Sequence, residues 1–112
     1  MTIKEIYEKV CIVIPIEQRL FFHRLNDTVA ELLALFPEKK VLKDGEEWEP
    51  VRSLEGVISI RGLFIPAIVD NILFLSGGGE GYKTEFLRKA QNAYKRYNTG
   101  DSKTRIIKRA GW

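Results

Sequence analysis

A glycine-rich segment followed by lysine and threonine is the part of this sequence closest to a known chemical motif. The segment reads Gly77-Gly-Gly-Glu-Gly-Tyr-Lys-Thr84. A phosphate-binding loop wraps its backbone around phosphate oxygens and requires glycine directly before the Lys-Thr pair. Tyr82 occupies that position, where its ring would crowd a phosphate. We therefore expect a loose, flexible connection between two helices here and no nucleotide site.

Metal-binding and nucleophilic residues are scarce. The chain has one histidine, His23, and one cysteine, Cys11. Zinc sites use three or four protein ligands, mostly of these two types, and a nucleophile pair would require His23 to meet Cys11 or a serine. A surface position for His23 and a buried position for Cys11 are the simpler interpretations. The acids Glu46, Glu47 and Glu49 are expected to face solvent. We predict no enzyme activity, no metal and no cofactor.

Positive charge is concentrated in the last third of the chain. Between residues 81 and 112, nine Lys or Arg face only two acids, a net charge of +7, whereas the first eighty residues carry −4. Such asymmetry indicates a polyanion or an acidic protein surface as partner. The structural alternative is a solvated helix face followed by a frayed terminus.

Composition limits the class of protein. A chain of 112 residues with 45% apolar and 29% charged residues is typical of one soluble globular domain. A single cysteine excludes a disulfide framework within the chain. The longest apolar stretch, Leu63 to Leu75, is interrupted and too short to span a bilayer. The first residues lack the apolar run of a signal peptide, so we expect an intracellular protein with no membrane partner.

Apolar residues recur at helical spacing in four segments. Thr2 and Glu5 form a capping box before a first helix that Pro15 ends. A second helix is predicted over about 17–36, with a possible restart at Thr28. A third is predicted to begin near 61–66 and run to 75, and a fourth spans 82–97. In the fourth helix, the tyrosines at 82, 94 and 97 share the apolar face, which favours a core role over stacking on nucleic-acid bases.

The middle of the chain has a different pattern. Asp44-Gly45 is a turn dipeptide between short β-prone stretches, which predicts a hairpin over about 41–51. Pro50 would confine its second strand to an edge. The predicted fold is therefore mainly α: a four-helix bundle-like single domain (1–98) with a short β-hairpin insertion, followed by an extended basic C-terminal tail (99–112).

This tail has the composition of a docking segment. It combines four basic residues with two isoleucines and a tryptophan, and the residues expected to contact a partner are Lys103, Arg105, Ile106, Ile107, Lys108, Arg109 and Trp112. Tryptophan and arginine are common interface anchors. Alternating basic and apolar residues suit an extended segment that adds a strand to another protein or fills a groove in it.

The order of several segments resembles a known family. The stretch from Val51 to Ile60, the proline-opened segment from Pro66 to Phe74, and Tyr82-Lys-Thr-Glu-Phe-Leu-Arg-Lys-Ala-Gln-Asn-Ala-Tyr94 follow one another as in the head–tail connector (adaptor) proteins of long-tailed bacteriophages and prophages. The opening MTIKEIYEKV is also similar to that of small phage proteins. The likeness covers most of the chain and rests on pattern and order.

The resemblance implies a structural virion-assembly protein. Such proteins form a ring, commonly of twelve subunits, beneath the portal, and DNA packaged into the capsid passes through the ring with weak contacts. The resemblance further implies that residues 99–112 grip the portal protein, with head-completion or tail proteins as neighbours. It places the protein in the host cytoplasm during assembly and then at the head–tail interface of the virion.

A second function fits the same charge distribution. A small helical DNA-binding module could use the basic fourth helix and the tail to contact phosphates. Its affinity would fall steeply with salt, whereas a connector would bind DNA weakly and self-associate. The absence of a helix-turn-helix or zinc pattern favours the connector.

Overall fold

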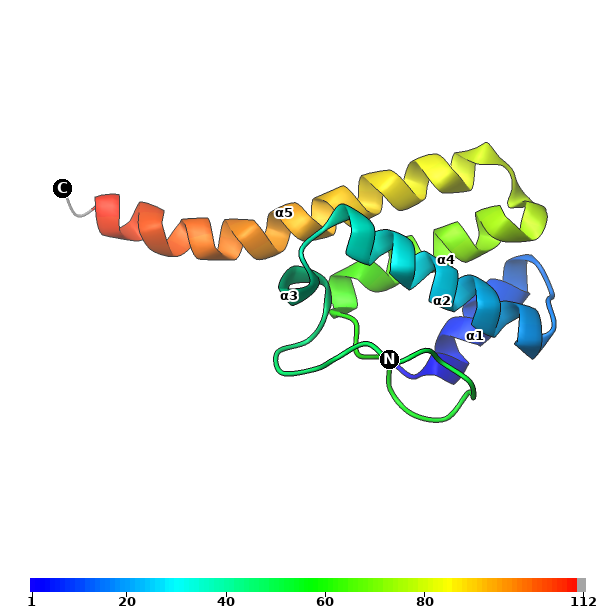
Figure 1. The fold of residues 1–112 in the computed structure, drawn as a ribbon. Helices are drawn as coiled ribbons and strands as arrows, with labels where there is room; N and C mark the ends of the chain where they lie inside the picture. Colours follow the sequence, from blue (N-terminus) through cyan, green and yellow to red (C-terminus); the bar gives the residue numbers. More distant parts are fainter. Residues whose placement is uncertain (111–112) are drawn as a thin grey trace.

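The computed structural model describes the backbone of residues 1–110 and the side chains of residues 1–97. The fold is all-α, as predicted, and no strand occurs within the described backbone (Figure 1). No helix in this part of the chain is both long enough and apolar enough to cross a membrane. The helices are α1 (Ile3–Val13), α2 (Gln18–Leu35), α3 (Glu38–Val41), α4 (Ile65–Leu73) and α5 (Glu80–Ala110), with a 3-10 turn η1 (Gly62–Phe64) and a π-helical turn η2 (Phe74–Gly78).

The first two helices begin and end close to the positions predicted. The Thr2 hydroxyl accepts the Glu5 backbone N–H at 3.2 Å, and the Glu5 carboxylate accepts the Thr2 backbone N–H at 3.0 Å. This capping box, through the backbone hydrogen bond first, lowers the pKa of Glu5. The restart suggested at Thr28 is wrong, because α2 is continuous and the Thr28 hydroxyl donates to the Arg24 carbonyl at 2.7 Å.

Helix α4 is the central helix of the bundle. Seven of its nine residues are buried, and it packs against α1, α2 and α5. Pro66 lies in its first turn, where the missing N–H removes no helical hydrogen bond. A helix that is apolar on nearly all sides is stable only when other helices surround it. The remaining helices therefore assemble around α4, as Figure 1 shows.

The core is formed by aliphatic residues and a cluster of aromatic rings. Phe21, Phe64 and Phe86 are fully buried. The ring of Phe36 lies 4.9 Å from that of Tyr94 and 5.9 Å from that of Phe64, measured between centroids. These contacts join the end of α2 to η1 and α5, and aromatic pairs of this kind contribute about 0.5–1.5 kcal/mol beyond their burial.

The predicted hairpin over 41–51 is wrong. Leu42 instead forms an isolated antiparallel bridge with Ile60, and Lys43 N–H donates to the Ser59 carbonyl at 2.9 Å. The second half of the expected hairpin has no strand partner among the described residues: both backbone groups of Val51 bond to the Asn26 side chain. Pro50 removes a ladder donor from so short a strand, and pairing with the apolar segment 58–60 buries more surface. Residues 43–61 therefore form a long irregular loop.

The predicted extended tail is also wrong at the backbone level. Helix α5 does not end at 98–100 but continues to Ala110, projecting beyond the body of the protein (Figure 1). Residues 98–110 contain no proline and one glycine, and a single glycine costs a helix only about 1 kcal/mol. The lysines, arginines and alanine that follow it are good helix formers. The helix therefore continues through Gly100, which was expected to end it.

Candidate docking surface along the last helix

The first part of α5 is held on the bundle by a narrow apolar stripe. Phe86, Ala90 and Ala93 are buried, and their separations of four and three residues place them on one face of the helix. The two alanines allow close approach to α4, the helix with which α5 makes its most extensive contact. The opposite face of this part of α5 is exposed to solvent.

The three tyrosines of α5 belong to the core face, as predicted. Tyr82, Tyr94 and Tyr97 are each partly buried and pack against the core. The Tyr97 ring stacks on Phe64 at 5.9 Å between centroids, and its hydroxyl accepts the Leu63 backbone N–H at 3.3 Å. Because these rings contact the protein interior, they do not form an open platform on which bases could stack.

Lys83 is bound within a polar network that joins three helices. Its ammonium group donates to the Glu31 carboxylate of α2 and, at 3.2 Å, to the Asn71 side-chain oxygen of α4. The Asn71 amide nitrogen donates to the Thr28 hydroxyl at 2.9 Å and to Glu31 at 3.3 Å. The Lys83 ammonium also lies 4.8 Å from the centroid of the Phe86 ring. This basic residue therefore stabilises the bundle and is not free to bind a partner.

Two further basic residues of α5 are paired with acids. Arg88 contacts Glu85 one turn earlier, at 2.5 Å, and this hydrogen bond lowers the pKa of Glu85. Lys89 Nζ lies 2.7 Å from Asp70 Oδ2 of α4. That contact is an ion pair rather than a hydrogen bond, because Oδ2 has no partner with hydrogen-bond geometry. Three of the five basic residues between 81 and 97 are thus neutralised by neighbouring carboxylates.

The uncompensated charge of α5 begins at Lys95 and Arg96. Both side chains are exposed, and neither forms an ion pair with another described residue. They lie where the helix leaves the bundle, directly before the segment with four more basic residues in its sequence. Among the described basic residues of α5, those without an ion pair therefore lie next to its basic distal segment.

The residues predicted to dock on a partner lie on or beyond this distal half. The backbone of Lys103, Arg105, Ile106, Ile107, Lys108 and Arg109 is helical, as part of α5. The side chains of these six residues, and Trp112 as a whole, lie outside the described residues. The prediction that they contact a partner remains a prediction.

Five of the fifteen acidic residues of the chain lie on the irregular loop. Glu46, Glu47, Glu49 and Glu55 are exposed, in agreement with the solvated role expected for the first three. Asp44 pairs with Arg61 at 2.7 Å. The molecule therefore presents an acidic loop and, separately, a basic helix end.

The glycine-rich segment forms the connection between α4 and α5. Gly77 and Gly79 have φ angles of 91° and 100°, which glycine adopts most readily. The Tyr82 ring covers Gly78 so closely that an added Cβ would lie 2.7 Å from the ring. The loose linker expected from the sequence is therefore wrong at Gly78, where the Tyr82 ring packs directly on the backbone.

His23 and Cys11 do not form a chemical site with one another. His23 is exposed on α2, and Cys11 is partly buried on α1 with its thiol 3.7 Å from the Ile16 carbonyl oxygen. The Tyr7 hydroxyl donates to the same carbonyl at 2.7 Å, and its contact with the Cys11 thiol raises the pKa of Tyr7. No group of three or more potential metal ligands occurs among the described residues.

Sequence reasoning missed the polar network inside the bundle. The sequence did contain an indication of this network, because Asp70 and Asn71 interrupt an otherwise apolar helix. A polar residue in such a position requires a hydrogen-bonding partner. What the sequence could not supply was the partner, since Lys83 and Lys89 come from a helix that follows later in the chain.

Comparison of the chain with protein-family models, with curated proteins and with solved structures finds no match.

Proposed function

We propose that this protein is a structural subunit of a phage head–tail connector, and that the distal half of α5 is its docking element. The observation that carries the proposal is that basic residues near the start of α5 are paired with acids, whereas the described ones farther along the helix are not. Near the bundle, Lys83, Arg88 and Lys89 form ion pairs, whereas Lys95 and Arg96 are exposed at the point where the helix projects beyond the body. A projecting helix whose sequence carries four further basic residues is suited to contact another molecule.

In this proposal the partner is a protein assembly. Residues 99–112 would grip the portal, and identical subunits would form a ring through which DNA passes. The acidic loop of one subunit and a basic surface of its neighbour would give the unlike contact that a ring requires. The sequence Arg105-Ile-Ile-Lys108 supports a protein partner, because isoleucine contributes to apolar interfaces and not to phosphate contacts.

The alternative is a DNA-binding module, and it draws on the same residues. Exposed Lys95 and Arg96 continue into the basic tail and could follow a phosphate backbone. The pairing of Lys83, Arg88 and Lys89 with acids weighs against it, since those cations are not available for phosphates.

Two matched variants separate the proposals. One replaces Lys103, Arg105, Lys108 and Arg109 with glutamine, and the other replaces Ile106 and Ile107 with serine. A portal gene is sought in the genome that carries this chain's gene, and binding is measured to its product and to short duplex DNA at low and moderate salt. A connector should bind the portal in a manner that both variants weaken, and should bind DNA weakly.

A DNA-binding module would behave differently. It would bind duplex DNA tightly and with a steep salt dependence, lose this binding in the charge variant, and retain it in the isoleucine variant. Light scattering on the same samples reports self-association. Tight, salt-steep DNA binding together with no portal binding would overturn the connector proposal.

A further inference from the structure

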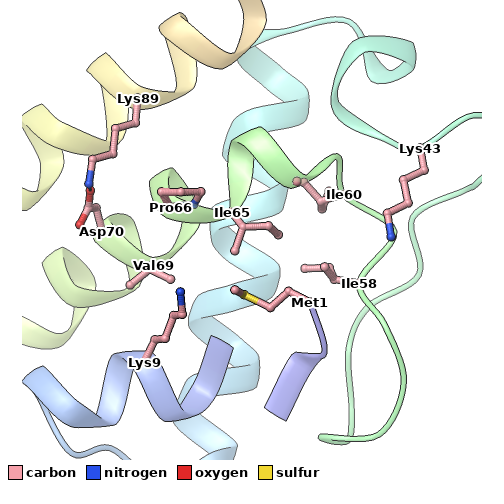
Figure 2. A pocket seen from close by; sticks show the side chains of 11 residues that line it. Met1, Lys9, Lys43, Ile58, Ile60, Ile65, Pro66, Val69, Asp70 and Lys89 are labelled. Carbon is pink, nitrogen blue, oxygen red and sulfur yellow. Dashed lines mark ion pairs between the residues drawn. The ribbon is translucent and has the colours of Figure 1, made fainter. Parts of the chain in front are cut away.

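A preformed pocket lies on the side of α4 that faces α1 and the long loop. Its volume is about 430 Å³, within the range of about 300–1,000 Å³ usual for small-molecule sites. It is bounded by α1, α4, α5 and the segment 58–62, so four parts of the chain fix its shape. Figure 2 shows its walls, which include four aliphatic side chains and three lysines: Ile58, Ile60, Ile65, Val69, Lys9, Lys43 and Lys89.

The interior of the pocket is apolar. Ile58, Ile60 and Ile65 are between 1% and 5% exposed, and they belong to the hydrophobic core. Val69 is partly buried and projects into the space from α4. These side chains are fixed by packing behind them, so the apolar wall exists before any ligand arrives. Such a wall favours an aliphatic or aromatic body over a polar one.

The rim of the pocket is cationic. Lys9 reaches it from α1, Lys43 from the long loop and Lys89 from α5, so three sides carry an ammonium group (Figure 2). Asp70 is the only acid in the lining, and it is already paired with Lys89 at 2.7 Å. Lys9 and Lys43 are exposed and form no ion pair with any other described residue. Neither ammonium group is therefore held in a direct ion pair, although the charge of Lys9 is among the causes that lower the pKa of Glu5, after its hydrogen bonds with Thr2.

We propose that this pocket binds an anionic amphiphile, with its apolar body against the isoleucines and its acidic group at the rim, beside Lys9 or Lys43, which lie on different sides of the pocket. The cationic rim is complementary to the acidic group of such a ligand, and the apolar interior is complementary to its hydrocarbon body. A cationic or neutral ligand of the same shape would match the interior alone. The proposal is independent of the docking role of α5, since it uses neither the distal helix nor a partner protein.

Ligand chemistry is tested with three probes of equal chain length. Decanoate, decanol and decyltrimethylammonium are titrated below their aggregation concentrations while amide NMR spectra of the full chain are recorded. Decanoate should shift the signals of residues 58–62, 65–70 and 9 saturably. It should bind about twofold to fivefold more tightly than the other two, because one exposed ion contact is worth about that much.

The matched variants separate charge from cavity. Lys9→Gln with Lys43→Gln should weaken decanoate binding about twofold to fivefold and leave decanol binding unchanged. Lys95→Gln with Arg96→Gln carries the same change in net charge away from the pocket and should leave both unchanged. Val69→Phe fills the cavity and should weaken all binding, while the spectrum elsewhere shows that the variant is folded.

Three outcomes would overturn the proposal. Equal binding of decanoate and decanol would leave a purely apolar cavity with no preference for anions. If the NMR shifts caused by decanoate are lost equally in the Lys95→Gln, Arg96→Gln control, then decanoate is attracted by net charge and not by the pocket. Shifts of the same pocket signals with protein concentration alone would mean that a second copy of the chain, and not an amphiphile, covers the pocket.

Discussion

At the scale of single residues, a few polar side chains determine how the irregular parts of this protein are attached to its helices. Asn26 on α2 is the clearest case. Its amide nitrogen donates to the Val51 carbonyl at 3.0 Å, and its oxygen accepts the Val51 N–H at 2.8 Å. One side chain thus satisfies both backbone groups of a buried residue that has no strand beside it.

The prediction at this scale concerns Asn26→Ala. The substitution leaves the N–H and C=O of Val51 without partners, so the free energy of unfolding should fall by about 1–3 kcal/mol. Urea unfolding of the two proteins measures the difference. Asn92→Ala, at an exposed position of α5, serves as control and should change stability by less than about 0.5 kcal/mol. Equal effects of the two substitutions would contradict the role assigned to Asn26.

At the scale of elements, the connection from α4 to α5 determines how the two most extensively packed helices meet. The last turn of α4 widens into η2, and the chain reverses through glycines with positive φ. Ser76 ties this turn to α2, because its hydroxyl accepts from Arg24 at 2.7 Å and donates to the Ile72 carbonyl at 2.7 Å. The segment that resembled a phosphate-binding loop is therefore a tightly packed reversal.

Two glycine substitutions test this connection. In Gly78→Ala, the new methyl group would lie 2.7 Å from the Tyr82 ring and 2.8 Å from the Leu73 carbonyl oxygen, so stability should fall by about 1–3 kcal/mol. Gly81→Ala lies inside α5, where a Cβ meets nothing within 4 Å, and should raise stability by about 0.5–1 kcal/mol. Thermal unfolding distinguishes them. A neutral Gly78→Ala would mean that the reversal is not closely packed.

At the scale of the whole molecule, α5 makes the protein elongated. The principal extents are 57, 30 and 22 Å, and the radius of gyration of the Cα atoms is 15.5 Å. A compact chain of this length would have a radius of gyration of about 13 Å. The excess arises from the helix end that extends past the bundle in Figure 1.

Small-angle scattering measures this difference in solution. The full chain should give a radius of gyration clearly above the compact value, and a chain ending at residue 98 should return to about 13 Å. Retained thermal unfolding of the shorter chain shows that its bundle is intact. If the full chain already scatters as a compact particle, then the distal half of α5 folds back on the body, and its role as a free docking element is wrong.

Much of the helical architecture could be predicted because it depends on local patterns. The capping box at Thr2, the prolines at 15 and 37 and the 3.6-residue spacing of apolar residues fix where α1 and α2 begin and end. The core role of the tyrosines of α5 follows from the same spacing. His23, the one histidine of the chain, lies on the surface, as the sequence predicted.

Tertiary structure decided the features that depend on distant partners. Leu42 pairs with Ile60 instead of the nearby 48–51, so a contact between two buried residues distant in sequence outweighs the local turn signal. Lys83 and Lys89 of α5 are paired because Glu31 and Asp70 lie beside them on other helices, whereas Lys95 and Arg96 are exposed. The cationic apolar pocket collects Lys9, Lys43 and Lys89 from three separate segments. By itself the sequence determined the helices and the unequal distribution of charge, whereas only packing determined which charges remain available to a ligand or partner, because an ion pair depends on distance in space and not on order along the chain.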